Sequence, residues 1–202
     1  MIKIIDYGLG NLSAFTNAFK SLNKKVDYIK NESDFKNASH IILPGVGSFD
    51  FAMELLSRSN LIPSLNDAVL SKKIPILGIC VGMQIMAKKS EEGKLDGLSW
   101  IDAEVKNMNH LNDKIYLPHM GWNNIEFSKD NPLIKNLNSN PNFYFLHSYY
   151  VNCVDHEAIL ATSYYGKDFA CSVNNENIFG VQFHPEKSHS SGLQLLKNFS
   201  EL

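Results

Sequence analysis

The sequence predicts an α/β fold: a mostly parallel central sheet flanked by helices, with an antiparallel β extension in the second half. The first half alternates apolar runs with segments of helical period, and strands separated by helices need crossover connections and pair in parallel. The second half has short segments rich in aromatic and β-branched residues, separated by turn signals such as "NNEN". With 202 residues, we expect a single domain over residues 1–202.

The elements of the first half follow from its hydrophobic pattern. The apolar run "HIILPG" is nearly continuous, which is typical of a strand buried on both faces of a sheet. The run "NLSAFTNAFKSL" has the period of an amphipathic helix. Predicted strands cover residues 2–7, 25–29, 40–45 and 74–79, and predicted helices cover residues 11–22, 49–56, 62–71 and 81–87.

The second half is predicted to form antiparallel hairpins and meanders, followed by a helix over residues 190–202. In that helix, Leu193, Leu196 and Phe199 share one face, and serines upstream are available as caps. The polar, turn-rich segments 107–114 and 128–142 indicate surface loops. The strand-like segments are 98–105, 142–152, 157–165 and 169–183.

Composition and charge exclude several classes of protein. A net charge of -2 gives no basic surface for nucleic acid or an anionic membrane, and no apolar run is long enough to span a bilayer. The first residues read as a strand and not as a signal peptide. The three cysteines have no disulfide or metal spacing, so we expect a soluble, cytoplasmic protein without a metal or cofactor.

Cys80 lies in "GICVG", between a predicted strand and a predicted helix. This is the pattern of a nucleophile elbow, in which a tight turn exposes the nucleophile at the carboxyl edge of a parallel sheet. The helix N-terminus favours a thiolate there. The alternative is a small apolar residue that packs at a strand end, which is the interpretation favoured for Cys153 and Cys171 because no such turn surrounds them.

A base for this thiol is expected in "GVQFHPEKS". His184 follows an alternating strand, and Glu186 stands two residues later, where its carboxylate can accept the second imidazole N–H. His40, His110 and His156 are expected to be structural or solvated. A metal site of Cys80, His184 and His189 lacks the short paired spacing that metal sites use.

The loop "PGVGSF" follows a third predicted strand and contains Gly45 and Gly47. Glycines let backbone N–H groups approach a ligand, as an oxyanion hole requires, although glycine turns after strands are common. The N–H of Val81, directly after the candidate nucleophile, is the expected second donor.

In this order and spacing, "PGVGSF", "GICVGMQ" and "GVQFHPEKS" resemble a class I glutamine amidotransferase domain with a Cys-His-Glu triad. The segments "DYGLGNL", "LPHMGWN" and "FLHSYY", with the lysine of "HPEKS", narrow the resemblance. They are similar to the HisH family, the glutaminase subunits of imidazole glycerol phosphate synthase, over essentially the whole chain.

The resemblance implies a role for each matching residue. Cys80, His184 and Glu186 would hydrolyse glutamine to glutamate and ammonia through a thioester. The backbone of Val46, Gly47 and Val81 would hold the oxyanion, and family members more often have leucine where this chain has Val81. The positions that match those holding glutamine are Gly47, Gln84, Ser148 and Tyr149.

The resemblance also implies a partner, a HisF-like (β/α)₈-barrel cyclase that forms a heterodimer with the glutaminase. The cyclase receives ammonia and makes imidazole glycerol phosphate and aminoimidazole carboxamide ribotide in histidine biosynthesis. Asn11, Trp122 and Lys187 fall in motifs that lie near this interface in the family. The alternatives are a core-packing indole for Trp122 and a solvated side chain for Lys187.

Other functions stay open on the sequence alone. A paralogous glutaminase would supply ammonia to a sugar-amidinating synthase with the same chemistry at Cys80. A catalytically silent binding subunit would keep the fold, although the intact Cys80, His184 and Glu186 argue against it. A cysteine peptidase is disfavoured because no groove signature or prosegment is evident.

Overall fold

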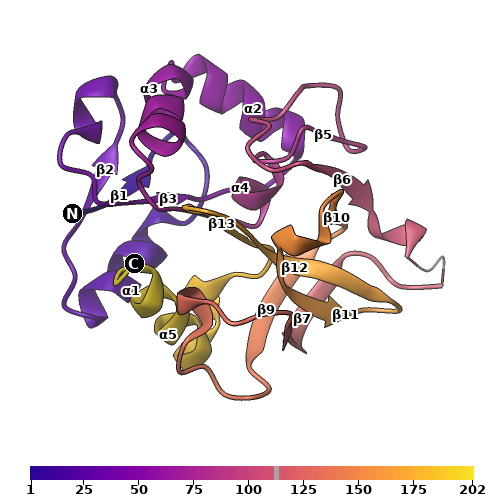
Figure 1. Cartoon of the computed structure of the whole chain (residues 1–202). Helices are drawn as coiled ribbons and strands as arrows, with labels where there is room; N and C mark the ends of the chain where they lie inside the picture. The colour runs from indigo at the N-terminus through magenta and orange to yellow at the C-terminus, as the bar shows by residue number, and fades with distance from the viewer. Residues whose placement is uncertain (112–113) are drawn as a thin grey trace.

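The computed structural model describes residues 1–111 and 114–202 of the chain. A mixed eight-stranded sheet forms its centre, and helices cover both faces, which confirms the predicted fold class (Figure 1). The spatial order of its strands is β2 (Val26–Ile29), β1 (Ile2–Ile5), β3 (His40–Leu43), β4 (Ile76–Ile79), β13 (Ile178–Val181), β12 (Asp168–Asn175), β11 (Ile159–Tyr164) and β8 (Glu126–Phe127).

The direction of the strands changes within this sheet. Pairing is parallel from β2 through β1, β3 and β4 to β13, and antiparallel from β13 through β12 and β11 to β8. Strand β13 therefore belongs to both halves, because it pairs in parallel with β4 and in antiparallel with β12. This placement brings the chain after β13 to the carboxyl edge of the parallel strands.

Helices lie above and below the sheet in the view of Figure 1. The upper layer consists of α2 (Phe49–Arg58), α3 (Ile62–Asn66) and α4 (Val81–Gln84), and the lower layer of α1 (Leu12–Ser21) and α5 (His189–Phe199). The shorter helical turns are η1 (Glu32–Phe35), η2 (Asp67–Ser71), η3 (Met108–His110), η4 (Pro132–Ile134), η5 (His156–Ala158) and η6 (Pro185–Lys187).

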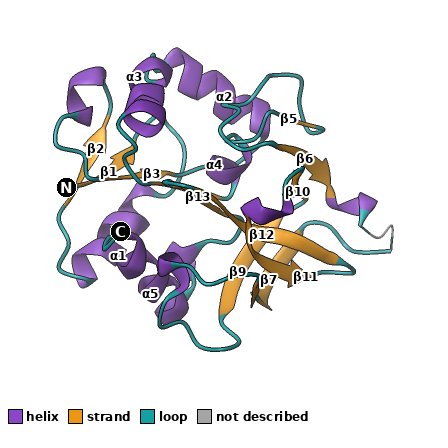
Figure 2. Cartoon of the chain, in the orientation of Figure 1, coloured by secondary structure: helices purple, strands orange, loops and turns teal. Residues whose placement is uncertain are grey.

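Two smaller sheets lie beside the antiparallel half, in the strand-rich part of the molecule (Figure 2). One has the order β10 (Tyr149–Cys153), β6 (Ala103–Asn107) and β5 (Lys89–Ser90), and the other pairs β7 (His119–Asn124) with β9 (Asn142–His147) in antiparallel. None of the helices in the described part of the chain has the length and hydrophobicity of a membrane span.

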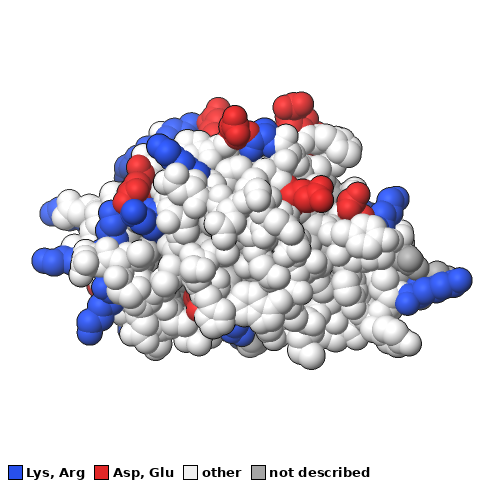
Figure 3. Space-filling view, turned by 90° about the horizontal axis from the view of Figure 1, so that it is seen from below, with Lys and Arg blue, Asp and Glu red and all other residues white. Residues whose placement is uncertain are grey.

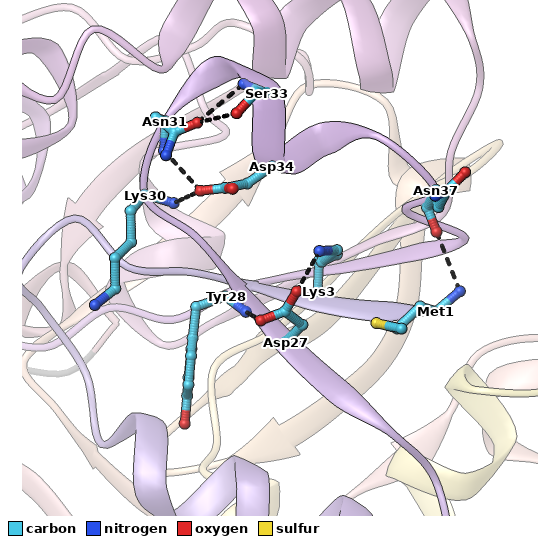
Figure 4. A network of polar contacts seen from close by, with 9 residues as sticks. All are labelled: Met1, Lys3, Asp27, Tyr28, Lys30, Asn31, Ser33, Asp34 and Asn37. Atoms are coloured by element: carbon cyan, nitrogen blue, oxygen red, sulfur yellow. Dashed lines mark hydrogen bonds and ion pairs between the residues drawn. The ribbon is translucent and has the colours of Figure 1, made fainter.

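The parallel strands form the core, since β1, β4 and β13 are buried along their whole length. One polar side chain in β1, Lys3, is also buried, and its Nζ lies 2.6 Å from Oδ2 of Asp27, its register partner on the edge strand β2 (Figure 4). The hydrogen bond from Lys3 holds the pKa of Asp27 below its usual value. The buried ammonium is therefore paired, as a charge inside a sheet must be.

The predicted helix over 81–87 is too long, because α4 ends at Gln84. The carbonyls that would continue it accept hydrogen bonds from a distant segment: Leu98 N donates to Ile85 O at 2.8 Å and Trp100 N to Met86 O at 2.9 Å. The same pairing explains why the predicted strand 98–105 is shifted. Residues 98–101 bond back to this turn, and β6 starts only at Ala103.

Other boundaries differ in smaller ways. The predicted helix 62–71 is α3 followed by one π turn, in which Lys72 N donates to Asp67 O. Segment 142–152 forms two strands in two different sheets, β9 and β10. The buried face of α5 contains Leu195 with Leu196 and Phe199, whereas Leu193 is only partly buried. Within the predicted loop 107–114, residues 112–113 lie outside the described residues.

Candidate active site

Cys80 occupies the sharp turn between β4 and α4, as the elbow pattern predicts. Its φ is +55° and its ψ is -113°, a backbone conformation that non-glycine residues rarely adopt. The turn is fixed on both sides: Cys80 N donates to Val181 O at 2.8 Å, and Cys80 O accepts from Met83 N and Gln84 N at 3.0 and 3.1 Å. Strain of this kind persists only where the surroundings fix it, and it concentrates at functional sites.

Two glycines let the elbow pack against the "PGVGSF" loop. A Cβ on Gly82 would lie 2.0 Å from Leu43 O, and a Cβ on Gly45 would lie 2.3 Å from Gly82 N. Backbone therefore packs directly on backbone at this point, without a side chain between them. The approach brings the loop with Val46 and Gly47 beside Cys80, and Gly47 adopts a positive φ of +92°.

His184 reaches the sulfur because β13 runs parallel to β4. The register pairs Val181 with Ile79, so the chain leaves β13 next to Cys80. His184 N donates to Tyr144 O at 2.8 Å, and Ser188 Oγ donates to His184 O at 2.6 Å. These bonds hold the backbone that carries the imidazole.

Glu186 lies behind the imidazole. His184 Nδ1 is 2.8 Å from Glu186 Oε1, and the two side chains are only 4% and 3% exposed. A carboxylate accepts, so Nδ1 carries the proton and Nε2 is the nitrogen left for Cys80. Burial lowers the pKa of His184. Hydrogen bonds and charge interactions with Cys80 and Glu186 outweigh this effect and raise the pKa above its ordinary value, to about 9. His184 is therefore an imidazolium at neutral pH, held between the Cys80 sulfur and the Glu186 carboxylate.

A cavity of about 300 Å³ opens in front of Cys80 and His184. Its wall contains every residue predicted for the oxyanion hole and for glutamine binding, together with Lys187. The lining residues are Val46, Gly47, Cys80, Val81, Gln84, Glu92, Pro118, Leu146, His147, Ser148, Tyr149, His184 and Lys187. Such a volume suits a small substrate.

Several residues of this site were not predicted from the sequence. Leu146 and His147 immediately precede the predicted Ser148, and Glu92 and Pro118 reach the cavity from distant loops. Gln182 lies behind Cys80, with its Nε2 at 3.6 Å from the sulfur. The sequence does not single it out, because Gln182 looks like one polar residue at the end of an apolar run until its contact with Cys80 is seen.

His147 is part of a buried chain of polar contacts. Its Nδ1 lies 2.8 Å from Tyr149 O, which only accepts, so its Nε2 accepts from His119 Nδ1 at 3.0 Å. Asn123 Nδ2 reaches the other nitrogen of His119 at 3.3 Å. Burial lowers the pKa of His119 to about 4, and burial with the neighbouring histidines lowers that of His147 to about 3. Both imidazoles are therefore neutral at physiological pH.

The three predicted interface residues are exposed, and two of them lie together. Trp122 and Lys187 both contact Tyr144: the indole at 6.1 Å between ring centroids, and the ammonium at 5.5 Å from the ring centroid. Asn11 is the N-cap of α1, where its Oδ1 accepts from Ala14 N. The cap gives Asn11 a structural role, and its place at a partner interface stays a prediction. The indole of Trp122 is 47% exposed and is not packed in the core.

The remaining cysteines and histidines lie away from the cavity. Cys153 and Cys171 are buried thiols on β10 and β12, and burial raises the pKa of Cys153 to about 11. His189, the third member of the alternative metal site, stacks on Trp122 at 5.0 Å. Over residues 1–111 and 114–202, no group of three or more His, Cys, Asp or Glu side chains is arranged to hold a metal ion. None of His40, His110 and His156 lines the cavity.

Comparison with known proteins identifies the family of the chain. The profile of the family "Glutamine amidotransferase class-I" matches residues 3–201. Two solved structures share the fold: a glutamine amidotransferase with a TM-score of 0.77 and 16% identity, and PurLQS from Thermotoga maritima with 0.75 and 14%. Each alignment covers 99% of this chain and 97% of the other. The fold and the family profile define a class I glutamine amidotransferase.

Relatives with similar sequences narrow the class to one family. Imidazole glycerol phosphate synthase subunit HisH of Leptospira interrogans is 52% identical over 204 residues, covering 100% of both chains. The same subunit of Bdellovibrio bacteriovorus is 47% identical, and subunit HisH 2 of Pseudomonas aeruginosa is 42% identical, each with full coverage of both chains. The chain belongs to the HisH family, the glutaminase subunits of imidazole glycerol phosphate synthase in histidine biosynthesis.

Proposed function

We propose that the chain hydrolyses glutamine at Cys80, as one domain over residues 1–202, and passes the ammonia to a cyclase partner in the cytoplasm. The observation that carries this proposal is the buried Cys80–His184–Glu186 arrangement at the edge of a 300 Å³ cavity. No cofactor or metal enters the reaction, because a thiolate, an imidazolium and backbone donors supply all of its steps.

In the first half of the reaction, the Cys80 thiolate attacks the side-chain carbonyl carbon of glutamine. The carbonyl oxygen becomes an oxyanion, which N–H groups of the Val46–Gly47 loop and of Val81 stabilise. His184 Nε2 then donates its proton to the nitrogen, the carbon–nitrogen bond breaks, and ammonia leaves. A glutamyl thioester on Cys80 remains.

In the second half, neutral His184 takes a proton from water, and the hydroxide attacks the thioester carbon. The carbon–sulfur bond breaks, glutamate leaves, and the thiolate and imidazolium are restored. Glu186 keeps the imidazole in one orientation and stabilises its charged form in both halves. Gly47, Gln84, Ser148 and Tyr149 hold the amino acid end of glutamine from the cavity wall.

The proposed partner surface is the outer face of the β7–β9 ribbon, defined by Met120, Trp122, Tyr144 and Leu146. Cross-strand register pairs Met120 with Leu146 and Trp122 with Tyr144, so their side chains form one apolar stripe. Figure 3 views the molecule from the side of β7, β9 and α5, and shows a broad area with few charged side chains. A HisF-like barrel docked on this β7–β9 face would form a heterodimer with the chain.

The β7–β9 face lies next to the cavity, which supports it as the side through which ammonia is transferred. Leu146 belongs both to the β7–β9 face and to the cavity wall, and Lys187 lies on the cavity wall and over Tyr144. A partner covering this face would shield released ammonia from bulk water, where it would be protonated and lost as a nucleophile. Trp122 is the expected anchor, since large aromatic residues dominate interface energetics.

The test of the nucleophile uses the complex reconstituted with its cyclase. Cys80→Ala should abolish product formation from glutamine and leave product formation from ammonium salt at the wild-type rate. Loss of both activities would show that Cys80 supports the assembly instead of the chemistry. Retention of the glutamine-driven activity would exclude Cys80 as the nucleophile.

The test of the partner surface is a binding measurement. Trp122→Ala should raise the dissociation constant for the cyclase by about tenfold or more, as for a typical interface anchor. Leu70→Ala is a matched control, because Leu70 is 44% exposed and Trp122 47%, but Leu70 lies outside the β7–β9 face. Equal affinities of the two variants would remove the proposed surface.

A further inference from the structure

Gln182 is a fully buried polar residue for which the reaction above has no role. It stands just beyond β13, between Val181 and Phe183, and its exposed fraction is 0%. Burying an amide without partners is costly, so each of its polar atoms needs an explanation. The partners of the Gln182 side chain are Cys80 on one side and Gln84 on the other.

The contacts of Gln84 fix which end of the Gln182 amide faces the sulfur. Gln84 Nε2 lies 3.2 Å from the carbonyl oxygen of Tyr149, which only accepts hydrogen bonds. The end of the Gln84 amide that faces Tyr149 O is therefore its NH₂ group. The second hydrogen of this group is donated to Gln182 Oε1 at 3.0 Å. The amide group of Gln182 consequently turns its Nε2, a donor, toward Cys80 Sγ at 3.6 Å.

We propose that Gln182 is a further catalytic residue: its buried amide N–H donates to the sulfur of Cys80 and stabilises the thiolate in which the attack begins. The inference rests on the proposed role of Cys80 as nucleophile. An amide without charge, enclosed beside the sulfur, is a donor of fixed direction that needs no reorganisation during the reaction. Gln84 acts as a positioning residue for this donor, in addition to its place on the cavity wall.

The second contact of the sulfur explains why a donor is needed there. Leu146 O lies 3.9 Å from Sγ, where it can accept a weak bond from the neutral thiol but repels a thiolate. When the S–H proton moves to His184 Nε2, the bond to Leu146 O is lost and the one from Gln182 Nε2 gains strength, since its acceptor is now charged. The two contacts thus favour opposite protonation states of Cys80.

Other ionisable side chains also face this site, and they come from several elements. Tyr7 and His147 are buried, and their pKa values respond to the charges of Cys80 and His184 respectively. None of these side chains is altered by a substitution of Gln182, so the comparison with wild type tests the amide. These side chains are Tyr7, Glu92, His147, His184, Glu186 and Lys187.

The experiment measures the rate at which iodoacetamide alkylates Cys80 in the full chain as a function of pH. Mass spectrometry of the peptide that contains Cys80 separates it from Cys153 and Cys171. Gln182→Leu should move the midpoint of the alkylation profile upward by about one to two pH units, the loss expected for one hydrogen bond to a charged group. The rate on the alkaline plateau should stay within about twofold of wild type, because only the ionisation changes.

Gln182→Glu is the second variant, because it keeps the shape of the side chain and the acceptor for Gln84. Its carboxylate faces the thiolate in place of a donor, so the midpoint should rise further than in Gln182→Leu. Asn198→Leu is the matched control, since Asn198 is also a buried amide but bonds to Leu133 O and Lys135 O. It should lower stability and leave the midpoint unchanged.

Wild-type midpoints in both Gln182 variants would overturn the inference while Cys80 remained the nucleophile. Failure of the proposed function would look different: a glutamine-analogue electrophile would then leave Cys80 of the wild-type chain unlabelled, whatever the midpoints of the variants.

Discussion

Gly82→Ala should disable glutamine hydrolysis by moving the elbow and not by removing a reactive group. A Cβ at position 82 would lie 2.0 Å from Leu43 O and 3.2 Å from Pro44 C, and real Cβ atoms essentially never approach closer than 3.0 Å. The difference means that α4 and the end of β3 must separate by about 1 Å. Because α4 begins directly after Cys80, this shift moves the sulfur relative to the glycine loop.

A misplacement of about 1 Å between reacting groups costs about 100-fold in rate, and overpacking of a core costs about 1–3 kcal/mol of stability. The assay is kcat/KM for glutamine in the reconstituted complex, with ammonium-driven synthesis and urea unfolding measured on the same samples. We expect about 100-fold loss of the glutamine-driven activity and an unchanged ammonium-driven activity.

Gly97→Ala is the matched control for this substitution. A Cβ at position 97 would lie 2.1 Å from Ala87 O, so its clash with backbone is about as severe as that at position 82. Gly97, however, packs on the turn after α4 and not on the glycine loop beside Cys80. A similar loss of stability with a much smaller loss of glutaminase activity is expected. Activity of Gly82→Ala within twofold of wild type would show that the elbow tolerates separation from the loop, and that the close backbone packing is not needed for glutamine hydrolysis.

Two further predictions concern protonation. Burial lowers the pKa of His184, but Cys80 and Glu186 together raise it to about 9, and Glu186→Gln removes the contribution of the carboxylate. The alkaline limb of the kcat/KM profile, expected near pH 9 in the wild type, should therefore move to lower pH, with about 10- to 100-fold lower activity at neutral pH. An unmoved limb would exclude His184 as its source. In the folded chain the pKa values of His119 and His147 are about 4 and about 3, whereas in the unfolded chain both imidazoles bind protons below about pH 6.5. The free energy of unfolding should therefore fall as the pH drops from about 6.5 toward these folded values. In urea unfolding, the loss of unfolding free energy between about pH 6 and about pH 4 should be about 2 kcal/mol smaller in His147→Gln than in the wild type. An equal loss in the two proteins would show that His147 is not the neutral, buried group.

Local sequence predicts the elbow and the fold class well, for a physical reason. Cys80 and Val81 follow a buried strand, and the turn between β4 and α4 depends on neighbouring glycines that the sequence displays. His184 could be expected near Cys80, since parallel strands end at the same edge of a sheet. Glu186 stands only two residues after His184, so its carboxylate cannot lie far from the imidazole.

Features that depend on distant backbone could not be predicted in this way. The end of α4 is set by residues 98–101, which take the carbonyls of the turn after it, and periodicity contains no information on that pairing. The apolar stripe of the β7–β9 face needs the cross-strand register of Trp122 with Tyr144. Likewise, Gln182 looks like one polar residue in an apolar strand until the Gln84 side chain fixes its orientation.

The proposed reaction requires the Cys80 sulfur to face the glutamine cavity and to exchange a proton with His184. Covalent labelling by a glutamine-analogue electrophile, read out on peptides by mass spectrometry, measures this reactivity. We expect one label per chain, on Cys80, prevented by excess glutamine and much slower in His184→Ala. Labelling at Cys153 or Cys171, or labelling of Cys80 at the same rate without His184, would contradict it.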